Sequence, residues 1–286
     1  MKKLSILNES IFFSVLRIIT RPFLLKPALE VLLSINKNFF GLQKKAYKKK
    51  IHIPVVNVEH ALDSAIPFRP EYVKIYMDFT YFWIRAAGFF LRSFGGEAEP
   101  YVKSFLIDIK DVYAFAARVY SKMTSTTRRP VYKKSFLFRV IYAFDPHLMC
   151  VPSLHVMVVV YTYSKARSIF AALGVEDAFK DDIKAARDHA LAITDSILFV
   201  KQHSVNCIAA ALYALNCFNS SLLTKDEARL FTGGLLGENN GIVNEEDKKA
   251  VREYILNLFE TFCEEKESHK NWEDVLINFL KKSPAA

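Results

Sequence analysis

The sequence predicts an all-α fold, and three observations support that prediction. The chain has 286 residues but only 9 glycines and 10 prolines, so turns are few and long helices are expected. Alternating patterns typical of half-buried strands are almost absent, whereas apolar residues recur at helical spacing. With 51% hydrophobic and 14% aromatic residues, the chain can bury a sizeable core and is not expected to be disordered.

An N-terminal extension is expected over residues 1–50. Apolar side chains at helical spacing predict an amphipathic helix over residues 5–35, and a basic run, Lys44–Lys50, comes after it. No small-residue cleavage site follows the first apolar run, so a removable signal peptide is not expected. The helix and the basic run together suit anionic lipid headgroups, although a solvated loop also explains the lysines.

A helical core is expected over residues 51–223. Pro54, Pro67 and Pro70 indicate a loop or linker at its start. The helices expected after this linker cover residues 71–93, 99–122 and 134–143, a segment that begins at Pro152, and residues 176–202 and 205–223. Proline suits the first position of a helix, because the N–H that it lacks would have no partner there.

A C-terminal extension is expected over residues 224–286. Thr224 begins a capping-box sequence that predicts a helix start. A turn-rich loop over residues 233–241 precedes Asn244, which is expected to cap a charged amphipathic helix, and a last short helix surrounds residues 272–280. This extension indicates a packing or partner surface, because it carries no catalytic motif.

Charge and cysteine content limit the partners. A formal net charge of +9 favours phosphate esters, anionic lipid surfaces or nucleic acid. Nucleic-acid binding is not expected, because no recognised motif interleaves the cations with exposed aromatic residues. Cys150, Cys207, Cys217 and Cys263 have neither a zinc-site spacing nor the density of a disulfide framework. We therefore expect reduced thiols, no metal site and no cofactor.

Membrane association is expected, but the sequence leaves its form open. Two long stretches, residues 146–164 and 202–224, carry no charged residue and approach the length of a spanning helix. The first contains Pro152, Ser153 and His155, which are unfavourable in a lipid-facing helix. We expect a membrane-associated protein, peripheral or integral, with a soluble cytoplasmic protein as the alternative.

Three short motifs carry cations, hydroxyls and imidazoles in the middle of the chain. They are Lys122 with Arg129-Pro130, Pro152-Ser153-Leu154-His155, and Ser196 with Lys201-Gln202-His203. Cationic side chains and the N–H groups of a helix start suit the oxygens of a phosphoryl group. One histidine could attack phosphorus while the other protonates the leaving alcohol. The motifs therefore indicate phosphoryl transfer.

In order and spacing these motifs resemble the type-2 phosphatidic acid phosphatase and vanadium haloperoxidase superfamily, and most closely its inositol-phosphorylceramide-synthase-like subgroup. The first two motifs match in full, with Leu154 at a position often held by glycine. The third is partial, since Ile197 replaces an arginine and Cys207 stands where an aspartate is expected. The resemblance covers residues 122–207.

The resemblance implies a compact helical bundle that works as a metal-independent phosphatase. Its substrate would be a phosphate monoester, such as phosphatidic acid, hydrolysed through a phosphohistidine. His203 would be the nucleophile, His155 the general acid and then the base, and Cys207 would take the place of the aspartate that orients the nucleophile. The implied phosphate-binding residues are Lys122, Arg129, Ser153, Leu154, Ser196 and Lys201.

The departures from the family pattern leave alternatives open. A neutral thiol at Cys207 is a poor hydrogen-bond acceptor, and losing an orienting carboxylate can cost about 10⁴-fold in rate. Residues two apart on a helix face away from each other, so the helix must break near Lys201 if that residue is to join His203. The alternatives are an impaired phosphate- or lipid-binding protein, a phosphoalcohol transferase, or a vanadate-dependent haloperoxidase. The remaining histidines, His147 among them, are expected to be structural or on the surface.

Overall fold

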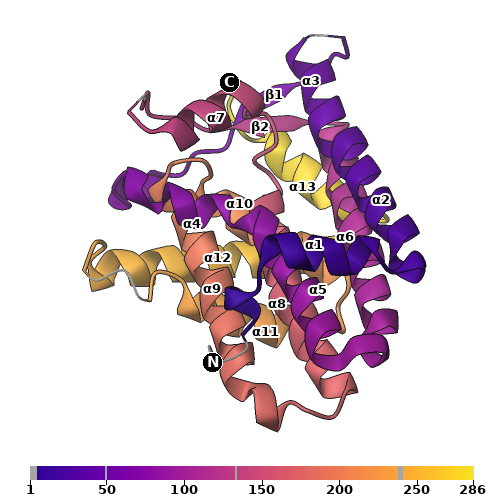
Figure 1. The fold of residues 1–286 in the computed structure, drawn as a ribbon. Coiled ribbons are helices and arrows are strands. Elements are labelled where there is room, and N and C mark those ends of the chain that lie inside the picture. Colours follow the sequence, from indigo (N-terminus) through magenta and orange to yellow (C-terminus); the bar gives the residue numbers. More distant parts are fainter. Residues whose placement is uncertain (1–4, 49, 133, 238–240) are drawn as a thin grey trace.

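The computed structural model describes residues 5–48, 50–132, 134–237 and 241–286 (Figure 1). It is predominantly helical, which confirms the all-α class. The helices are α1 (Ile11–Ile19), α2 (Pro22–Ile35), α3 (Leu42–Tyr47), α4 (Val73–Met77), α5 (Phe79–Phe94), α6 (Glu99–Tyr120), α7 (Phe136–Phe144), α8 (Leu154–Ala172), α9 (Lys180–Phe199), α10 (Val205–Phe218), α11 (Lys225–Gly234), α12 (Glu245–Glu265) and α13 (Trp272–Lys281). Lys49 of the predicted basic run and residues 238–240 of the predicted turn-rich loop lie outside the described residues.

The N-terminal segment is not the single helix that was expected over residues 5–35. It divides into α1 and α2, and Pro22 occupies the first turn of α2. Proline lacks the N–H that a continuing helix needs and its ring crowds the preceding turn, so the helix ends and starts again. Ser10 caps α1 by accepting a hydrogen bond from the Phe13 N–H. A π-helical turn, Asn36–Gly41, joins α2 to α3.

Both N-terminal helices pack on the long helices of the core (Figure 1). Helix α1 lies against α5, and α2 lies against α6. The α1–α5 contact is close, because a Cβ atom added at Gly88 would lie 1.9 Å from Oγ of Ser14. Only one narrow stripe of each N-terminal helix is buried, with Ile18 on α1 and Leu24 and Val31 on α2. The opposite faces remain exposed.

A two-stranded parallel sheet forms where the sequence predicted no strand. Strands β1 (Val55–Asn57) and β2 (Thr124–Thr126) pair with Val55 opposite Thr124. Three residues are too few to show an alternating pattern, which explains why sequence periodicity missed them. The sheet positions the chain that follows, since Ser125 Oγ accepts a hydrogen bond from the Val151 N–H at 2.8 Å.

The central helices α8 and α10 are buried along most of their length and share one hydrophobic core with the helices around them. The predicted caps at Thr224 and Asn244 are confirmed, because each side chain accepts a backbone N–H three residues ahead. The prediction that Pro152 occupies the first helical position is wrong. Ser153 is the N-cap and α8 begins at Leu154, so the proline precedes the cap.

In the described part of the chain, no helix combines the length and the apolar character that crossing a membrane requires.

Candidate functional site

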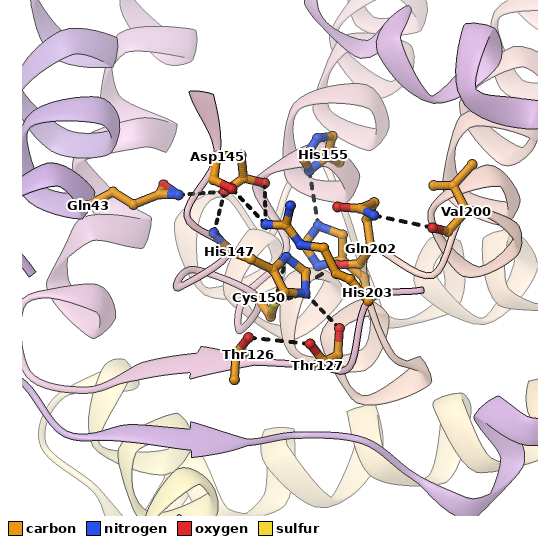
Figure 2. A network of polar contacts seen from close by, with 11 residues as sticks. Gln43, Thr126, Thr127, Asp145, His147, Cys150, His155, Val200, Gln202 and His203 are labelled. Atoms are coloured by element: carbon orange, nitrogen blue, oxygen red, sulfur yellow. Dashed lines mark hydrogen bonds and ion pairs between the residues drawn. The ribbon is translucent and has the colours of Figure 1, made fainter. Parts of the chain in front are cut away.

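The starts of two core helices bring His155 and His203 together. His155 lies in the first turn of α8, and His203 directly precedes Ser204, the N-cap of α10. The two helix starts are joined by a hydrogen bond from the Ser153 N–H to the Cys207 carbonyl at 3.3 Å. As a result, His203 Nε2 lies 3.1 Å from His155 Nδ1, both side chains being buried (Figure 2). The positive ends of two helix dipoles meet here, which favours an anion.

The predicted helix break at Lys201 is confirmed. Helix α9 ends at Phe199, and Lys201 adopts a left-handed conformation with φ of 54°. The Gln202 N–H then donates to the Ile197 carbonyl at 3.0 Å, which is the hydrogen bond of a Schellman motif. This reversal lets the chain turn from α9 into α10 and directs His203 towards His155.

The break does not bring the Lys201 side chain to the histidines. Its ammonium group donates to the backbone carbonyls of Asp63 and Ile66 instead. Both acceptors belong to the connection between β1 and α4, so Lys201 anchors that connection to the α9–α10 turn. The structure therefore places Lys201 outside the group of predicted phosphate ligands that surround the histidines.

A third histidine, His147, joins the pair, although the sequence indicated a structural or surface role. It has a φ of 62°, and its Nε2 lies 2.8 Å from Thr127 Oγ1. Its ring centroid is 6.4 Å from that of His203 (Figure 2). The turn Asp145-Pro146-His147, close before the Pro-Ser motif, was the one sequence signal that could have drawn attention to it.

Arg129 reaches this cluster through Asp145. Its Nη2 donates to the Asp145 carbonyl at 2.8 Å and lies 3.5 Å from Oδ2 of the same residue. The other carboxylate oxygen of Asp145 accepts hydrogen bonds from the His147 N–H at 2.8 Å and from Gln43 Nε2 at 2.5 Å (Figure 2). Asp145 therefore already binds the guanidinium group that the resemblance assigns to phosphate. No sequence motif pointed to Gln43, and only the turn before the Pro-Ser motif pointed to Asp145.

The imidazoles of His147 and His155 are held neutral. Burial lowers the pKa of His155 well below its ordinary value, and the nearby His203 adds to the effect. Burial, followed by the Arg129 guanidinium, lowers the pKa of His147 well below its ordinary value. The ring of His155 is also enclosed by Tyr76 and Phe79, with centroid distances of 4.6 and 4.0 Å.

The Cys207 thiol is more acidic than the sequence suggested. It is fully buried, and burial opposes its ionisation. The neighbouring side chains of Cys150 and His203 and the Ser204 N–H outweigh burial and lower the pKa of Cys207 to about 6. The Ser204 N–H donates to Cys207 Sγ at 3.4 Å. The other ring nitrogen of His203, Nδ1, is buried and makes no hydrogen bond. The direction of this pKa shift is opposite to the one that a neutral thiol on an apolar helix would have.

The remaining predicted phosphate ligands divide into two groups. Leu154 lines the small cavity beside the histidines, and Ser153 is buried at the α8 start with its hydroxyl used as the cap. Lys122 and Ser196 have other partners. The Lys122 ammonium pairs with Glu273 at 3.4 Å and with Asp274 on α13, while the Ser196 hydroxyl donates to a carbonyl of its own helix. The structure thus brings Arg129, Ser153 and Leu154 towards the histidines.

The cavity beside the three histidines is small. It measures about 10 Å³, which is room for one water molecule. Asp145 and His147 form part of its wall and also border an open cleft of about 440 Å³, which Arg129 and Thr127 line as well. A ligand in this cleft would contact the guanidinium first and would reach His203 only if the wall moved.

Among the described residues, no group of three or more histidine, cysteine, aspartate or glutamate side chains is arranged to hold a metal ion. Searches against protein-family models, curated proteins and solved structures found no match to this chain.

Proposed function

We propose that the chain is a phosphatase that hydrolyses a phosphate monoester, of a lipid or a small molecule, through a phosphohistidine on His203. The observation that carries the proposal is the pair of buried imidazoles, His203 and His155, 3.1 Å apart where two helix starts converge. Arg129 supplies an arginine cation, in contact with Asp145 at the edge of the same cluster. Converging helix dipoles and a guanidinium suit the equatorial oxygens of a transferring phosphoryl group.

Substrate binding begins with the exchange of one anion for another. A phosphate entering the cleft beside Thr127 replaces the Asp145 carboxylate on the Arg129 guanidinium, where it can form a bidentate pair. Release of Asp145 loosens the turn that carries His147 and opens the wall of the small cavity. The phosphorus then approaches His203.

His203 acts as the nucleophile, and His155 acts first as the acid and then as the base. Nε2 of His203 forms a bond to phosphorus, the bond from phosphorus to the alcohol oxygen breaks, and His155 gives a proton to that oxygen. In the second half, His155 accepts a proton from water, the water oxygen bonds to phosphorus, and the N–P bond breaks. Burial lowers the pKa of His155 in the free protein, but a bound dianionic phosphate would raise that pKa and favour the protonated form.

The test is release of inorganic phosphate from phosphatidic acid in detergent and from a soluble aryl phosphate. We expect His203→Ala to lower turnover by about 10⁶-fold, as expected for loss of a nucleophile. His52→Ala, which removes an exposed imidazole far from the cluster in sequence, is the matched control and should leave turnover unchanged. An acid-labile phosphate that is trapped on wild type and absent from His203→Ala would identify the intermediate. Wild-type turnover that His203→Ala does not change would refute the proposal.

A second candidate is a phosphate-binding protein without turnover. It is favoured by the small size of the cavity and by the engagement of Lys122 and Lys201 with other partners. Calorimetric titration with inorganic phosphate separates the two candidates. Saturable binding without turnover, together with turnover gained by Cys207→Asp, would establish the impaired protein.

A further inference from the structure

The N-terminal helices expose apolar side chains on the face that points away from the core. Counting only the described residues, 17 large apolar side chains are exposed, and 11 of them lie between Phe12 and Phe40. This segment is about a tenth of the chain, so the concentration is strong. Monomeric soluble proteins rarely expose large continuous apolar patches without an interaction to cover them.

The exposed residues form one row along each helix. On α2, Leu25, Leu29, Leu32 and Leu33 follow the spacing of a single helical face, and Leu33 is 66% exposed. On α1, Phe12, Leu16 and Ile19 follow the same rule, and Phe12 is 71% exposed. Since the buried stripes already pack on α5 and α6, the exposed rows are not needed to hold the helices in place.

Exposed lysines accompany this face and have no acidic partner in the described part of the chain. They are Lys26, Lys37, Lys44, Lys45, Lys48 and Lys50. Between Ser10 and Lys50 the sequence holds one acidic residue, Glu30, whose carboxylate lies 3.8 Å from Lys110 on α6. An apolar face bordered by unpaired lysines is typical of helices that lie in the interface of an anionic bilayer.

We propose that α1, α2 and the basic segment through Lys50 dock on an anionic lipid surface, with the apolar rows in the headgroup region and the lysines on lipid phosphates. A second copy of the chain fits this surface less well, because pairing the faces would place two sets of unpaired lysines against each other. Charge complementarity therefore favours anionic lipid over self-association.

The docking segment also lines a cleft that adjoins the cleft containing Arg129. A cleft of about 630 Å³ lies between the π-helical turn, α3 and the end of α7, with Phe40, Tyr47 and Phe144 in its walls. Both phenylalanines are exposed at this cleft, and Tyr47 also borders the cleft that contains Arg129. Docking through α1 and α2 places Phe40 at the lipid surface. The docking proposal itself does not depend on catalysis.

The test is co-sedimentation of the full chain with vesicles of phosphatidylcholine alone or mixed with phosphatidylserine. We expect binding to the mixed vesicles, weakened by salt. Lys44→Gln with Lys45→Gln should lower the partition coefficient by about 30-fold, since each interfacial lysine contributes about fivefold. Lys249→Gln with Lys281→Gln, two exposed lysines of the C-terminal extension, is the control and should bind as wild type.

The apolar rows need their own variant. Leu29→Ser, Leu32→Ser and Leu33→Ser together should abolish vesicle binding, whereas Leu230→Ser on α11, also exposed, should not affect it. Circular dichroism and thermal unfolding confirm that each variant is folded. Wild type that stays in the supernatant with anionic vesicles would overturn the proposal. So would a wild-type dimer that the triple variant converts to a monomer, because the face would then bind a second copy. Phosphate release from the soluble aryl phosphate, measured without vesicles, reports on the proposed function separately.

Discussion

Nε2 of His203 lies 3.1 Å from Nδ1 of His155, so one of these two nitrogens must carry the hydrogen that joins them. A nucleophilic His203 needs its lone pair on Nε2, which makes His155 the donor from Nδ1. His203 then carries its own hydrogen on Nδ1. The neighbouring His203 side chain is one of the groups that lower the pKa of the Cys207 thiol. The proposed mechanism therefore requires this tautomer of each histidine, and the hydrogen bond between them must break before Nε2 of His203 can attack phosphorus.

The Lys201 ammonium group should contribute to stability rather than to substrate binding. Lys201→Met leaves the carbonyls of Asp63 and Ile66 without their donor, so we expect the free energy of unfolding to fall by about 1–3 kcal/mol. Lys201→Gly loses the same bonds but suits the left-handed backbone, so it should be less destabilised. Urea unfolding measures both. A KM for the aryl phosphate that rises tenfold in the folded Lys201→Gly variant would contradict this assignment.

Arg129 and Lys122 should behave differently, although the resemblance assigns both to phosphate. Arg129→Gln removes the guanidinium beside His147, and we expect kcat/KM to fall by about 10²–10³-fold. Lys122→Gln removes a half-exposed ammonium group that pairs with Glu273. The Glu273 carboxylate still pairs with Arg118, so kcat/KM should stay within about threefold of wild type. Steady-state kinetics with the aryl phosphate compares them directly. Equal losses in the two variants would place Lys122 in the site.

Cys207 should be the thiol that ionises near neutral pH. Burial raises the pKa values of Cys150, Cys217 and Cys263, whereas the pKa of Cys207 is lowered from about 9 to about 6. Titration of thiolate ultraviolet absorbance should show one transition near pH 6 that Cys207→Ser removes and Cys217→Ser keeps.

The same shift links Cys207 to stability. Because its pKa is lower in the folded protein, the thiolate stabilises the fold fully above about pH 9, and this contribution is lost as the pH falls to about 6. The pH dependence of unfolding between these values should therefore be shallower in Cys207→Ser than in wild type. An unchanged slope would show that the thiol stays neutral.

Asp195 should oppose stability at alkaline pH. Burial raises the pKa of this carboxyl to about 7, although the Leu236 N–H and the cations of Arg252 and Lys248 favour the charge. A raised pKa means that the stabilising protonated form is lost as the pH rises through about 7. Asp195→Asn keeps an acceptor for Leu236 and should be more stable than wild type at pH 8 by on the order of 4 kcal/mol, with little difference near pH 4.

Thermal unfolding at several pH values checks the Asp195 prediction. Asp177→Asn changes an exposed carboxylate and serves as the control. If Asp195→Asn lowered stability at pH 8, the carboxylate would have to be stabilised by its neighbours in the folded protein.

Several elements could be predicted from the sequence because their signals are local. Thr224 and Asn244 cap helices because their side chains bond to N–H groups three residues ahead, which needs no tertiary contact. The break at Lys201 was predicted in order to bring Lys201 beside His203. The break is present, but that reason was wrong, because the Lys201 side chain binds the carbonyls of Asp63 and Ile66 instead. The division of the N-terminal helix at Pro22 was missed although its signal was also local.

The sequence by itself determined the helical class, the caps and the pairing of His155 with His203 as candidates, because spacing and residue type are properties of the chain. Tertiary packing alone decided which cations reach those histidines. Lys122 pairs with a carboxylate, and Lys201 donates to two carbonyls, on segments distant in sequence. The Asp145 turn brings Arg129 and His147 to the cluster instead. A long flexible cation is placed by whichever acceptor the fold puts within its reach, and sequence spacing does not specify that acceptor.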